Sequence, residues 1–317
     1  MNTTIKFGWR IPDFPEDRPP DPAQRGRTFR DQILEFLEVI HGHFDSAWAG
    51  DHFFPWPADM DQSLDTLEPW TLVTYLMASF PKMRFCPSVL NQAYRSPALV
   101  AKMAAVLQLL SGGRLILGIG AGWKENEQRA YGYDFPPPKV RLDQLEEAVK
   151  IIRTMWTDGA PTFQGKYYSI RDAYCSPQPI PPPPLLIGGF GPKRTLRIVA
   201  EHADWCNIND ADLEFCRDRL AVLRQHCEAV RRPYDAILKS YICDCVALAP
   251  THVEAEALKN NSFFSPYEPM TGTPDELSAR IREYAELGFS YFVLRFADYP
   301  KTDGVKLFIR EVLPRFS

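Results

Sequence analysis

Three side chains of different chemistry stand close together after an apolar run of the sequence. In GDHFFPW (50–56), Asp51, His52 and Trp56 bring together a carboxylate, an imidazole and an indole. Because imidazole titrates near neutral pH, His52 could orient or protonate a substrate, with Asp51 holding its ring. Trp56 could form an apolar wall for a planar ligand. The segment predicts either a wall of an active site or a strand-end turn with a structural histidine.

A second segment with chemical potential follows another apolar run. LGIGAGWKENE (117–127) carries Gly118, Gly120 and Gly122 at alternate positions, where missing side chains let the backbone approach a flat group. The spacing is G-x-G-x-G, not the G-x-G-x-x-G of dinucleotide sites, and no P-loop lysine follows. A glycine-assisted bend at a strand end explains the pattern equally well.

A third segment predicts an anion site. IGGFGPKRT (187–195) places a glycine-rich loop before a helix, and the free N–H groups of a helix start favour a phosphate. Lys193, Arg194 and Thr195 add cationic and hydroxyl donors. By contrast, the sequence holds no H-x-H directly after its first strand-like run, no carboxylate cluster with metal spacing and no G-x-S-x-G elbow. We therefore expect no metal and no serine triad.

Composition narrows the class of protein. A formal charge of −4 over 317 residues gives no basic surface for nucleic acid, and no run is long and apolar enough to predict a membrane span or a signal peptide. The seven cysteines are odd in number and scattered, which favours reduced thiols. We expect a cytoplasmic protein that acts on a small molecule.

The order of elements predicts a (β/α)8 TIM barrel with insertions over residues 1–317. Amphipathic helical segments alternate with short apolar runs at about 40 residues per unit, the spacing of such barrels. The runs expected to form strands are 5–9, 45–50, 83–89, 114–120, 184–189, 204–208, 241–249 and 291–296. A proline-rich stretch, about 159–184, reads as a hairpin-like insertion. The alternative is a doubly wound open sheet, which would need fewer strands or a second domain.

Helix signals support this alternation. The segment 96–113 starts with Ser-Pro and ends with Gly-Gly, and 273–289 opens with a Thr-Pro-Asp-Glu capping box. Two further amphipathic helices are predicted over 28–44 and 141–159. We expect the loops 10–27 and 249–272 to cover the mouth of the barrel.

These segments together resemble the bacterial luciferase-like (β/α)8 oxidoreductases, which use flavin or deazaflavin. The resemblance rests on DHFFPW, RSPALVAKMAAVLQLLSGGRLILGIGAGW, RLDQLEEAVKIIRTMWTDG, FQGKYYSI, PPPPLLIGGFGPKRTLRIVAEHADWCN and GTPDEL, in the family's order over about 45–296. It implies a barrel whose C-terminal mouth holds the ring of the cofactor.

The resemblance also assigns cofactor contacts. A bulge with a non-proline cis peptide, which supports the ring in this family, aligns with Ser88-Val89, and Asn91 aligns with a polar contact to the ring or the ribityl chain. The glycine loop after the fifth strand inherits the phosphate. The cofactor-binding residues predicted are Asp51, Ser88, Val89, Asn91, Gly120, Gly122, Asn126, Gly188, Gly189, Phe190, Gly191, Arg194 and Thr195.

The opening segment is similar to the D-H-F-x-P-W of deazaflavin-dependent sugar-phosphate dehydrogenases. There the aspartate contacts the coenzyme, while the histidine and tryptophan line the reacting face. We therefore predict His52, Asp51 and Trp56 as catalytic residues. One departure stands out: those enzymes carry a glutamate where this chain has Trp123. Trp56 and Trp123 are predicted to line the substrate pocket, and Trp123 favours a more apolar substrate or a covered ring.

Three functions follow. The first is hydride transfer between coenzyme F420 and a small organic substrate, with His52 as the acid or base. The second is an FMN-dependent monooxygenase that uses oxygen and a partner flavin reductase. The third is a flavin-fold protein that binds without catalysis. The D-H-F-x-P-W match, with Lys193 and Arg194 available for an acidic tail, favours F420. The resemblance also implies a homodimer.

Overall fold

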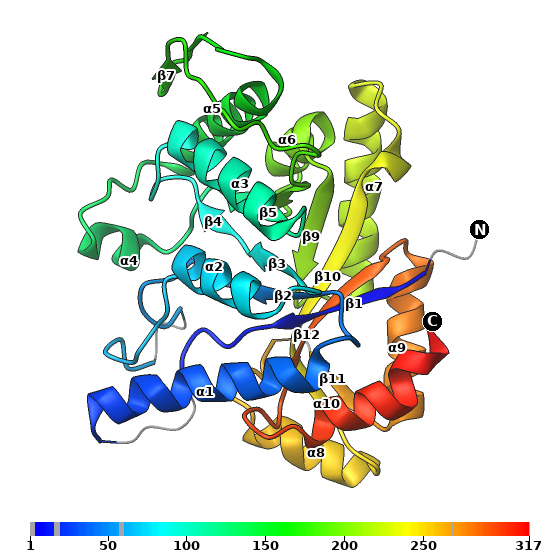
Figure 1. Cartoon of the computed structure of the whole chain (residues 1–317). Helices are drawn as coiled ribbons and strands as arrows, with labels where there is room; N and C mark the ends of the chain where they lie inside the picture. The colour runs from blue at the N-terminus through cyan, green and yellow to red at the C-terminus, as the bar shows by residue number, and fades with distance from the viewer. Residues whose placement is uncertain (1–3, 16–19, 57–59, 268, 317) are drawn as a thin grey trace.

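The strands form a parallel barrel (Figure 1). The computed structural model describes residues 4–15, 20–56, 60–267 and 269–316. Hydrogen-bonded strands follow the order β3 (Arg84–Pro87), β2 (Ser46–Ala49), β1 (Lys6–Arg10), β12 (Tyr291–Phe296), β10 (Leu238–Leu248), β9 (Trp205–Asn209), β8 (Leu185–Gly188), β5 (Leu117–Gly120) and β4 (Leu90–Asn91). A further strand, β11 (Met270–Gly272), pairs with β10.

The two ends of this path meet, which makes the sheet nearly closed. β3 and β4 are separated only by Ser88 and Val89, and a parallel bridge joins Phe85 beside them to Leu115 before β5. Parallel pairing runs through every neighbouring pair of the path. The prediction of a (β/α)8 barrel is confirmed, and the open doubly wound sheet is not what forms.

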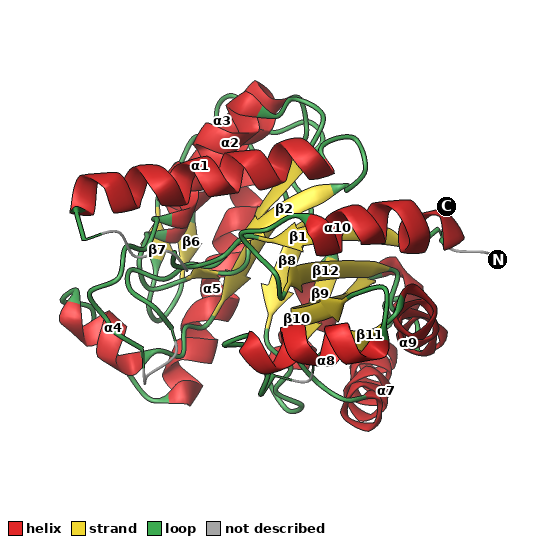
Figure 2. Cartoon of the chain, turned by 90° about the horizontal axis from the view of Figure 1, so that it is seen from below, coloured by secondary structure: helices red, strands yellow, loops and turns green. Residues whose placement is uncertain are grey.

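Helices surround the strands (Figure 2). Within the described residues they are α1 (Pro22–Ile40), α2 (Pro69–Ser79), α3 (Pro97–Ser111), α4 (Glu125–Ala130), α5 (Pro138–Thr157), α6 (Thr195–His202), α7 (Leu213–Ala229), α8 (His252–Asn261), α9 (Pro274–Glu286) and α10 (Asp303–Leu307). The apolar stripe of α1 buries Phe29, Ile33, Phe36, Leu37 and Ile40, as its spacing predicts. None of the described helices combines the length and apolarity needed to cross a bilayer.

The helix ends follow the sequence signals. Ser96 caps α3 by accepting a hydrogen bond from the Leu99 N–H at 3.3 Å, and Gly112 ends the helix with a φ of 67°. Thr273 and Glu276 form the predicted reciprocal capping box of α9. Local chemistry therefore sets these boundaries before any packing is considered.

Two predicted loops are partly helical. α1 begins at Pro22 because Asp21 caps it by accepting the N–H groups of Ala23 and Gln24, so residues 22–27 of the predicted loop 10–27 are helical. Residues 16–19 of that loop lie outside the described part of the chain. The stretch 249–272 contains α8, which starts with a capping box of Thr251 and Glu254. The Thr-His-Val-Glu sequence carried that signal.

The proline-rich insertion forms a small hairpin, as predicted. β6 (Phe163–Gln164) and β7 (Ser169–Ile170) pair antiparallel outside the barrel. Between them, the backbone N–H groups of Lys166, Tyr167 and Tyr168 donate to the carboxylate of Glu147 on α5. The hairpin is thus fastened to the outer helical layer.

The interior of the barrel is filled by side chains from the strands. One buried cluster, separate from the large core shared with the helices, contains Trp48, Cys86, Ile116, Leu186, Trp205, Ile242, Tyr291 and Val293. The indole N–H of Trp48 donates to the Ser46 hydroxyl at 2.6 Å, and that hydroxyl is 2.6 Å from the Tyr291 hydroxyl. Because the interior is plugged at this level, only the C-terminal end of the barrel is left open for a ligand.

Candidate active site

A cavity of about 850 Å³ lies at the C-terminal ends of the strands. Most of the predicted site residues line it: Asp51, His52, Trp56, Ser88, Val89, Asn91, Gly120, Gly122, Trp123, Gly188, Gly189, Phe190, Gly191 and Thr195. They come from segments up to about 140 residues apart in the chain, and the barrel brings them together because parallel strands present their carboxyl ends at one edge.

His52 is held by a carboxylate that the sequence analysis missed. Its Nδ1 lies 3.2 and 3.3 Å from the two carboxyl oxygens of Glu127 on α4. The hydroxyl of Tyr94 donates to the same carboxylate at 2.7 Å, and the N–H of Phe53 donates at 3.2 Å. Burial raises the pKa of Glu127, but the His52 and Tyr94 hydrogen bonds outweigh it and keep the pKa below its usual value.

An ionised Glu127 fixes the tautomer of the histidine. A carboxylate can only accept, so the Nδ1 of His52 carries the proton and donates, which leaves Nε2 as the ring nitrogen available in the cavity. Lys124 also lies 3.6 Å from Glu127 and donates to the carbonyl oxygens of Phe54 and Pro55. The loop after β2 and the helix after β5 are thereby tied together at the histidine.

Asp51 is arranged differently from the sequence prediction that it holds the histidine ring. Its buried carboxylate accepts the N–H of Asn91 at 2.7 Å and pairs with both terminal nitrogens of Arg95 at 3.1 and 3.2 Å. Arg95 also pairs with Glu68 before α2. Burial raises the pKa of Asp51, although Arg95 opposes that shift. Because Arg95 and the N–H of Asn91 bind both of its oxygens, the Asp51 carboxylate positions β4. Glu127, not Asp51, contacts the ring of His52.

Val89 forms a shelf across one side of the barrel mouth. The Ser88-Val89 peptide is cis, as the family resemblance implied. A Cβ atom added at Gly120 or Gly188 would lie 2.8 or 2.6 Å from a methyl carbon of Val89, and one at Gly118 would lie 3.0 Å from the other methyl. These three strand glycines are therefore the space into which Val89 fits.

Asn91 and Gly122 meet beside the shelf. Asn91 donates from its amide to the Gln128 side chain at 3.0 Å and accepts the N–H of Ala93 at 3.0 Å. Gly122 has a φ of 75°, and a Cβ there would lie 2.5 Å from the Asn91 side-chain oxygen. The glycine is needed both for its conformation and for the close approach.

The glycine loop after β8 ends at the first turn of α6. Gly189 has a φ of 103°, and a Cβ at Gly191 would lie 2.9 Å from the Thr195 hydroxyl. The Phe190 ring packs edge-on against Phe215 of α7, with 5.2 Å between centroids. One turn further along α7, Arg219 lines the same cavity and stacks on Phe215. Sequence analysis missed this cation because α7 carries several arginines and no pattern selects one.

Two predicted cofactor residues lie outside the cavity lining. Asn126 is exposed, and its side-chain oxygen accepts the N–H of Glu127. Arg194 turns toward α5, where it pairs with Asp143 at 2.7 Å and Glu146 at 3.3 Å. Their predicted contacts with a cofactor stay predictions, and in this structure Arg219 is better placed than Arg194.

Aromatic rings form the rim. Trp123 is 60% exposed, and its ring stands edge-on to His52 at 5.7 Å and to Trp56 at 6.5 Å. Trp56 also packs against Tyr267, with centroids 5.2 Å apart. Across the mouth, the lining changes to charged groups that the sequence analysis did not select: Arg10, Asp210 and Asp244.

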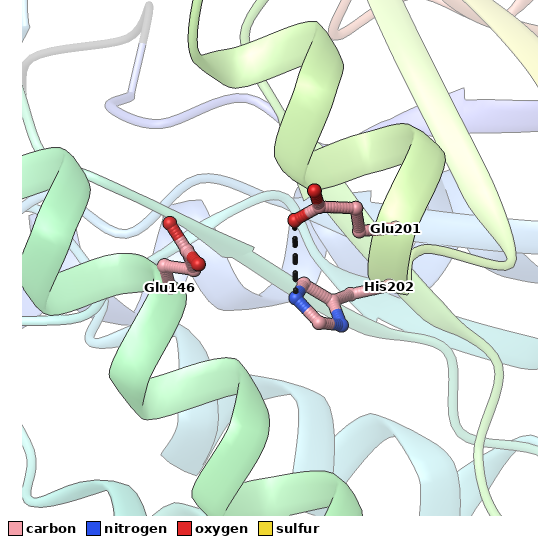
Figure 3. Close-up of side chains that lie close together, drawn as sticks. All are labelled: Glu146, Glu201 and His202. Carbon is pink, nitrogen blue, oxygen red and sulfur yellow. Dashed lines mark ion pairs between the residues drawn. The ribbon is translucent and has the colours of Figure 1, made fainter. Parts of the chain in front are cut away.

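A cluster of carboxylates and histidine outside the cavity does not belong to this site. Figure 3 shows Glu146 on α5 facing Glu201 and His202 on α6. Glu146 already pairs with Lys150 at 2.7 Å, and Glu201 pairs with Arg197 at 2.8 Å. Their charges are balanced by neighbouring cations.

Comparison with known proteins agrees with this geometry. The family model described as luciferase-like monooxygenase matches residues 41–270. The chain belongs to this family. An F420-dependent glucose-6-phosphate dehydrogenase of Amycolatopsis mediterranei is 26% identical over 90% of this chain and 94% of its own. An F420-dependent hydroxymycolic acid dehydrogenase of Mycobacterium tuberculosis is 31% identical over 61% of this chain and 57% of its own.

Solved structures show the same fold. An F420-dependent secondary alcohol dehydrogenase, in complex with an F420-acetone adduct, superposes with a TM-score of 0.81 at 21% identity and covers 99% of both chains. The F420-dependent tetrahydromethanopterin reductase of Methanopyrus kandleri gives 0.76 at 18% identity, covering 99% of this chain and 100% of its own. A riboflavin lyase with modified FMN gives 0.81 at 17% identity, covering 98% and 91%. The luciferase-like barrel predicted from the sequence is confirmed.

Proposed function

We propose that the protein is a coenzyme F420-dependent oxidoreductase that moves a hydride between the deazaflavin and a small organic substrate. The observation that carries this proposal is the His52–Glu127 pair, which faces the same cavity as the shelf of Val89 and its three glycines. Relatives named as F420-dependent dehydrogenases align over about nine-tenths of the chain and support the choice of cofactor.

The residues present fit a flat ring with a phosphorylated side chain. Because glycines replace side chains on β5 and β8, the Val89 side chain lies close against these strands and leaves room above it for a flat ring. The ring would rest there beside Asn91 and Gly122. The phosphate would meet the loop Gly188–Gly191 and Thr195, where the start of α6 and the Arg219 guanidinium favour an anion. The cavity, of about 850 Å³, is large enough for the ring and a substrate together.

His52 would accept the proton that is released when a hydride leaves an alcohol, and would return it in the reverse reaction. When bound, F420 provides a carbon that accepts or donates a hydride, which suits redox chemistry without oxygen. Oxidation of an alcohol also releases its hydroxyl proton, and the free Nε2 of His52 is placed to accept it. Ionised Glu127 stabilises the imidazolium that results and keeps the ring in one orientation. In the reverse direction, the same nitrogen returns the proton.

The aromatic rim has a separate role. Trp56, Trp123 and Tyr267 border the cavity beside His52 and would limit the access of water to a bound ring. Lower water access strengthens the His52–Glu127 interaction and prevents loss of hydride equivalents. Trp123 thereby serves in place of a charged contact at the position where sugar-phosphate dehydrogenases of this family carry a glutamate.

Binding of the cofactor is the first test. The purified protein is titrated with F420 and, separately, with FMN, and quenching of tryptophan fluorescence is recorded. Saturable quenching by F420, with weaker quenching by FMN, supports the proposal. Tighter binding of FMN, or of reduced FMN, would contradict it and indicate a monooxygenase that needs a flavin reductase. Failure of both to bind would indicate a binding or structural protein.

Glu127 gives a second test because it acts through His52. We expect Glu127→Gln to lower kcat by about 10²-fold while leaving KM and F420 affinity nearly unchanged, since the amide cannot stabilise the imidazolium. The matched control is Glu125→Gln on the exposed face of α4. Equal losses in F420 affinity and kcat would assign Glu127 to the stability of the site instead.

Assembly as a homodimer in a reducing compartment completes the proposal. Leu99, Leu109 and Leu110 of α3 and Tyr75 of α2 are each at least half exposed, which supports self-association through these helices. All seven cysteines are free and buried, which supports a cytoplasmic location. Sedimentation velocity tests the dimer, with Leu110→Glu as the variant expected to give monomers.

A further inference from the structure

The half of the barrel mouth opposite the Val89 shelf holds a buried network of charges. Arg10 at the end of β1 lies 3.4 Å from Asp13 and 3.7 Å from Asp244 on β10. Arg295 on β12 lies 2.8 Å from Asp13 and 3.3 Å from Asp244. Arg10 and Asp244 line the cavity, whereas Asp13 and Arg295 lie beneath them. We call Arg10, Asp13, Asp210, Asp244 and Arg295 the charged floor.

The charged floor leaves donors and an acceptor for a ligand. Arg10 Nε and Arg295 Nε lie 3.7 and 3.3 Å from the Oδ1 atom of Asp244, so among the described residues these atoms form ion pairs but no hydrogen bonds. Arg10 and Asp244 are each only 7% exposed. Buried charges that are paired without hydrogen bonds are incompletely satisfied, so a hydroxyl group that meets both Arg10 and Asp244 at the cavity wall would complete their hydrogen bonding.

Asp244 lies two residues after Ile242, and both line the cavity because alternate residues of a strand share one face. The pairing of β10 with β12 shifts register between Cys243 and Val246, where Cys243 pairs with Leu294 but Val246 pairs with Phe296. A bulge of this kind places an extra residue on one strand and redirects a side chain, and such bulges occur often beside active sites. In addition, the N–H of Asp244 donates to Asp210 at 2.8 Å, which ties the loop after β9 to the bulge.

The floor is balanced in charge when Asp210 keeps its proton. Burial, together with the neighbouring Asp244 carboxylate, raises the pKa of Asp210 to about 8. The Asp13 carboxylate and one negative charge on the Asp210–Asp244 pair then match the guanidinium groups of Arg10 and Arg295. No positive charge is left over at this end to receive an anion.

The remaining cations of the cavity wall do not change this balance. Lys124 is committed to Glu127 and to two backbone carbonyls. Arg219 lies on α7 beside Phe215, toward the glycine loop. A phosphate on the substrate would therefore be brought close to the carboxyl groups of Asp210 and Asp244 without an unpaired cation to offset the repulsion.

We propose that the charged floor binds hydroxyl groups of a neutral, polyhydroxylated substrate and rejects its phosphorylated counterpart. This inference rests on the proposed function, because it places the hydroxyl to be oxidised at His52 and a second hydroxyl at Arg10 and Asp244. Arg10 donates a hydrogen bond to that second hydroxyl oxygen, and Asp244 accepts a hydrogen bond from its O–H group, while Trp56 and Tyr267 cover the carbon skeleton. The substrate thus differs in charge from that named for the glucose-6-phosphate dehydrogenase relatives.

Matched pairs of compounds test the proposal. Glucose with glucose 6-phosphate, and glycerol with glycerol 3-phosphate, are titrated into the protein loaded with F420, with tryptophan fluorescence as the binding readout and F420 reduction as the kinetic one. We expect the neutral member of at least one pair to bind at least about tenfold more tightly than its phosphorylated partner. Tighter binding of the phosphorylated members, or binding of no neutral member, overturns the proposal.

Variants assign the selectivity to the floor. Asp244→Asn removes one carboxylate between two guanidinium groups, so the preference for the neutral compound should fall by about tenfold. Asp31→Asn, on the exposed face of α1, is the matched control and should leave the preference unchanged. Since Asp244 is buried, Asp210→Lys on the loop after β9 is measured as well, and it should reverse the preference. Unchanged preference in folded Asp210→Lys protein contradicts the assignment.

The two proposals fail in different ways. If F420 does not bind, the proposed function is wrong, and the sugar titrations repeated on the protein alone still report which charge the floor accepts. If F420 binds but the phosphorylated compounds are preferred, the function stands and the inference about the charged floor is wrong.

Discussion

The two halves of the barrel mouth are built by opposite means. On β4, β5 and β8, which we call the glycine half, the missing side chains of Gly118, Gly120 and Gly188 leave room for Val89. On β9, β10, β12 and β1, which we call the charged half, the surface is made by polar side chains whose charges balance one another, such as Arg295 with Asp13 and Asp244. The glycine half owes its shape to a single apolar side chain fitted against strand backbone, whereas the charged half depends on polar side chains from several strands.

His52 lies between the two halves, so its removal should give the largest difference between the effect on kcat and the effect on F420 affinity. We expect His52→Ala to lower kcat by about 10²–10⁴-fold, because the proton acceptor is lost, while F420 affinity changes by less than about threefold. Stopped-flow reduction of F420 and fluorescence titration measure the two effects. His43→Ala, exposed after α1, is the matched control. A parallel loss of F420 affinity would place His52 on the cofactor side instead.

The charged half should depend on pH for its stability, and the glycine half should not. Burial opposes ionisation of Asp13, but Arg10 and Arg295 lower its pKa to about 2. A lowered pKa stabilises the folded state above the unfolded value and loses that effect as pH falls from about 4 toward 2. Asp13→Asn should therefore lower the free energy of unfolding by about 2–3 kcal/mol at pH 7.

Urea unfolding at pH 7, 5 and 3 measures this effect. The difference between wild type and Asp13→Asn should shrink at the lowest pH, where the Asp13 carboxyl of the unfolded wild-type chain is largely protonated. The Asp31→Asn variant is expected to match wild type throughout. A difference that stays constant with pH would mean that the variant acts by packing alone.

The glycine half should depend on shape. Gly188→Ala would place a methyl group 2.6 and 2.9 Å from the two methyl carbons of Val89, so we expect a loss of about 1–3 kcal/mol in stability together with weaker F420 binding. Val89→Ala removes both methyls, and the double variant should recover part of the loss. Gly26→Ala on α1, where a Cβ meets no atom within 4 Å, is the control. Additive losses in the double variant would show that the contact is not what matters.

The smallest effect concerns Asp210. Above about pH 8, this carboxyl should release its proton and add negative charge beside Asp244, so KM for a phosphorylated compound should rise a few-fold relative to its neutral partner. Asp210→Asn should remove this pH dependence. The charged or titratable groups around Asp210 are Asp244, Arg295, Tyr241, Cys243 and Cys245. A pH dependence that persists in Asp210→Asn would assign it to one of these groups.

Sequence reasoning succeeded for the frame of the barrel and in part for the glycine half. Strand runs and caps such as Ser96 are local signals, so the fold could be predicted from them and from the family resemblance. The glycines at 118 and 120 were expected to let the backbone approach a flat group and that at 188 to bind a phosphate, whereas in the structure all three make room for Val89. The Ser88-Val89 cis peptide was likewise expected from the resemblance and is present.

The charged half and the partner of His52 could not be predicted from the sequence, because both depend on contacts between distant segments. Glu127 lies 75 positions from His52, and in KENEQ only the direction of the short helix α4 decides which carboxylate faces inward. Asp210 and Asp244 meet because β9 and β10 are neighbours, which neither segment reveals. Arg194 fits a phosphate by position in the chain, but Asp143 and Glu146 of α5 attract it away.

The bulge in β10 has a consequence for how this barrel could acquire new specificities. Side chains alternate between the two faces of a strand, so deleting the extra residue between Cys243 and Val246 would turn the side chains that precede it relative to those that follow. Loss of one codon there, with no change in the glycine half, would then change which side chains of this stretch face the cavity beside Asp244. Substrate choice in a lineage of such enzymes could therefore change by the length of one strand, while the cofactor is inherited unaltered.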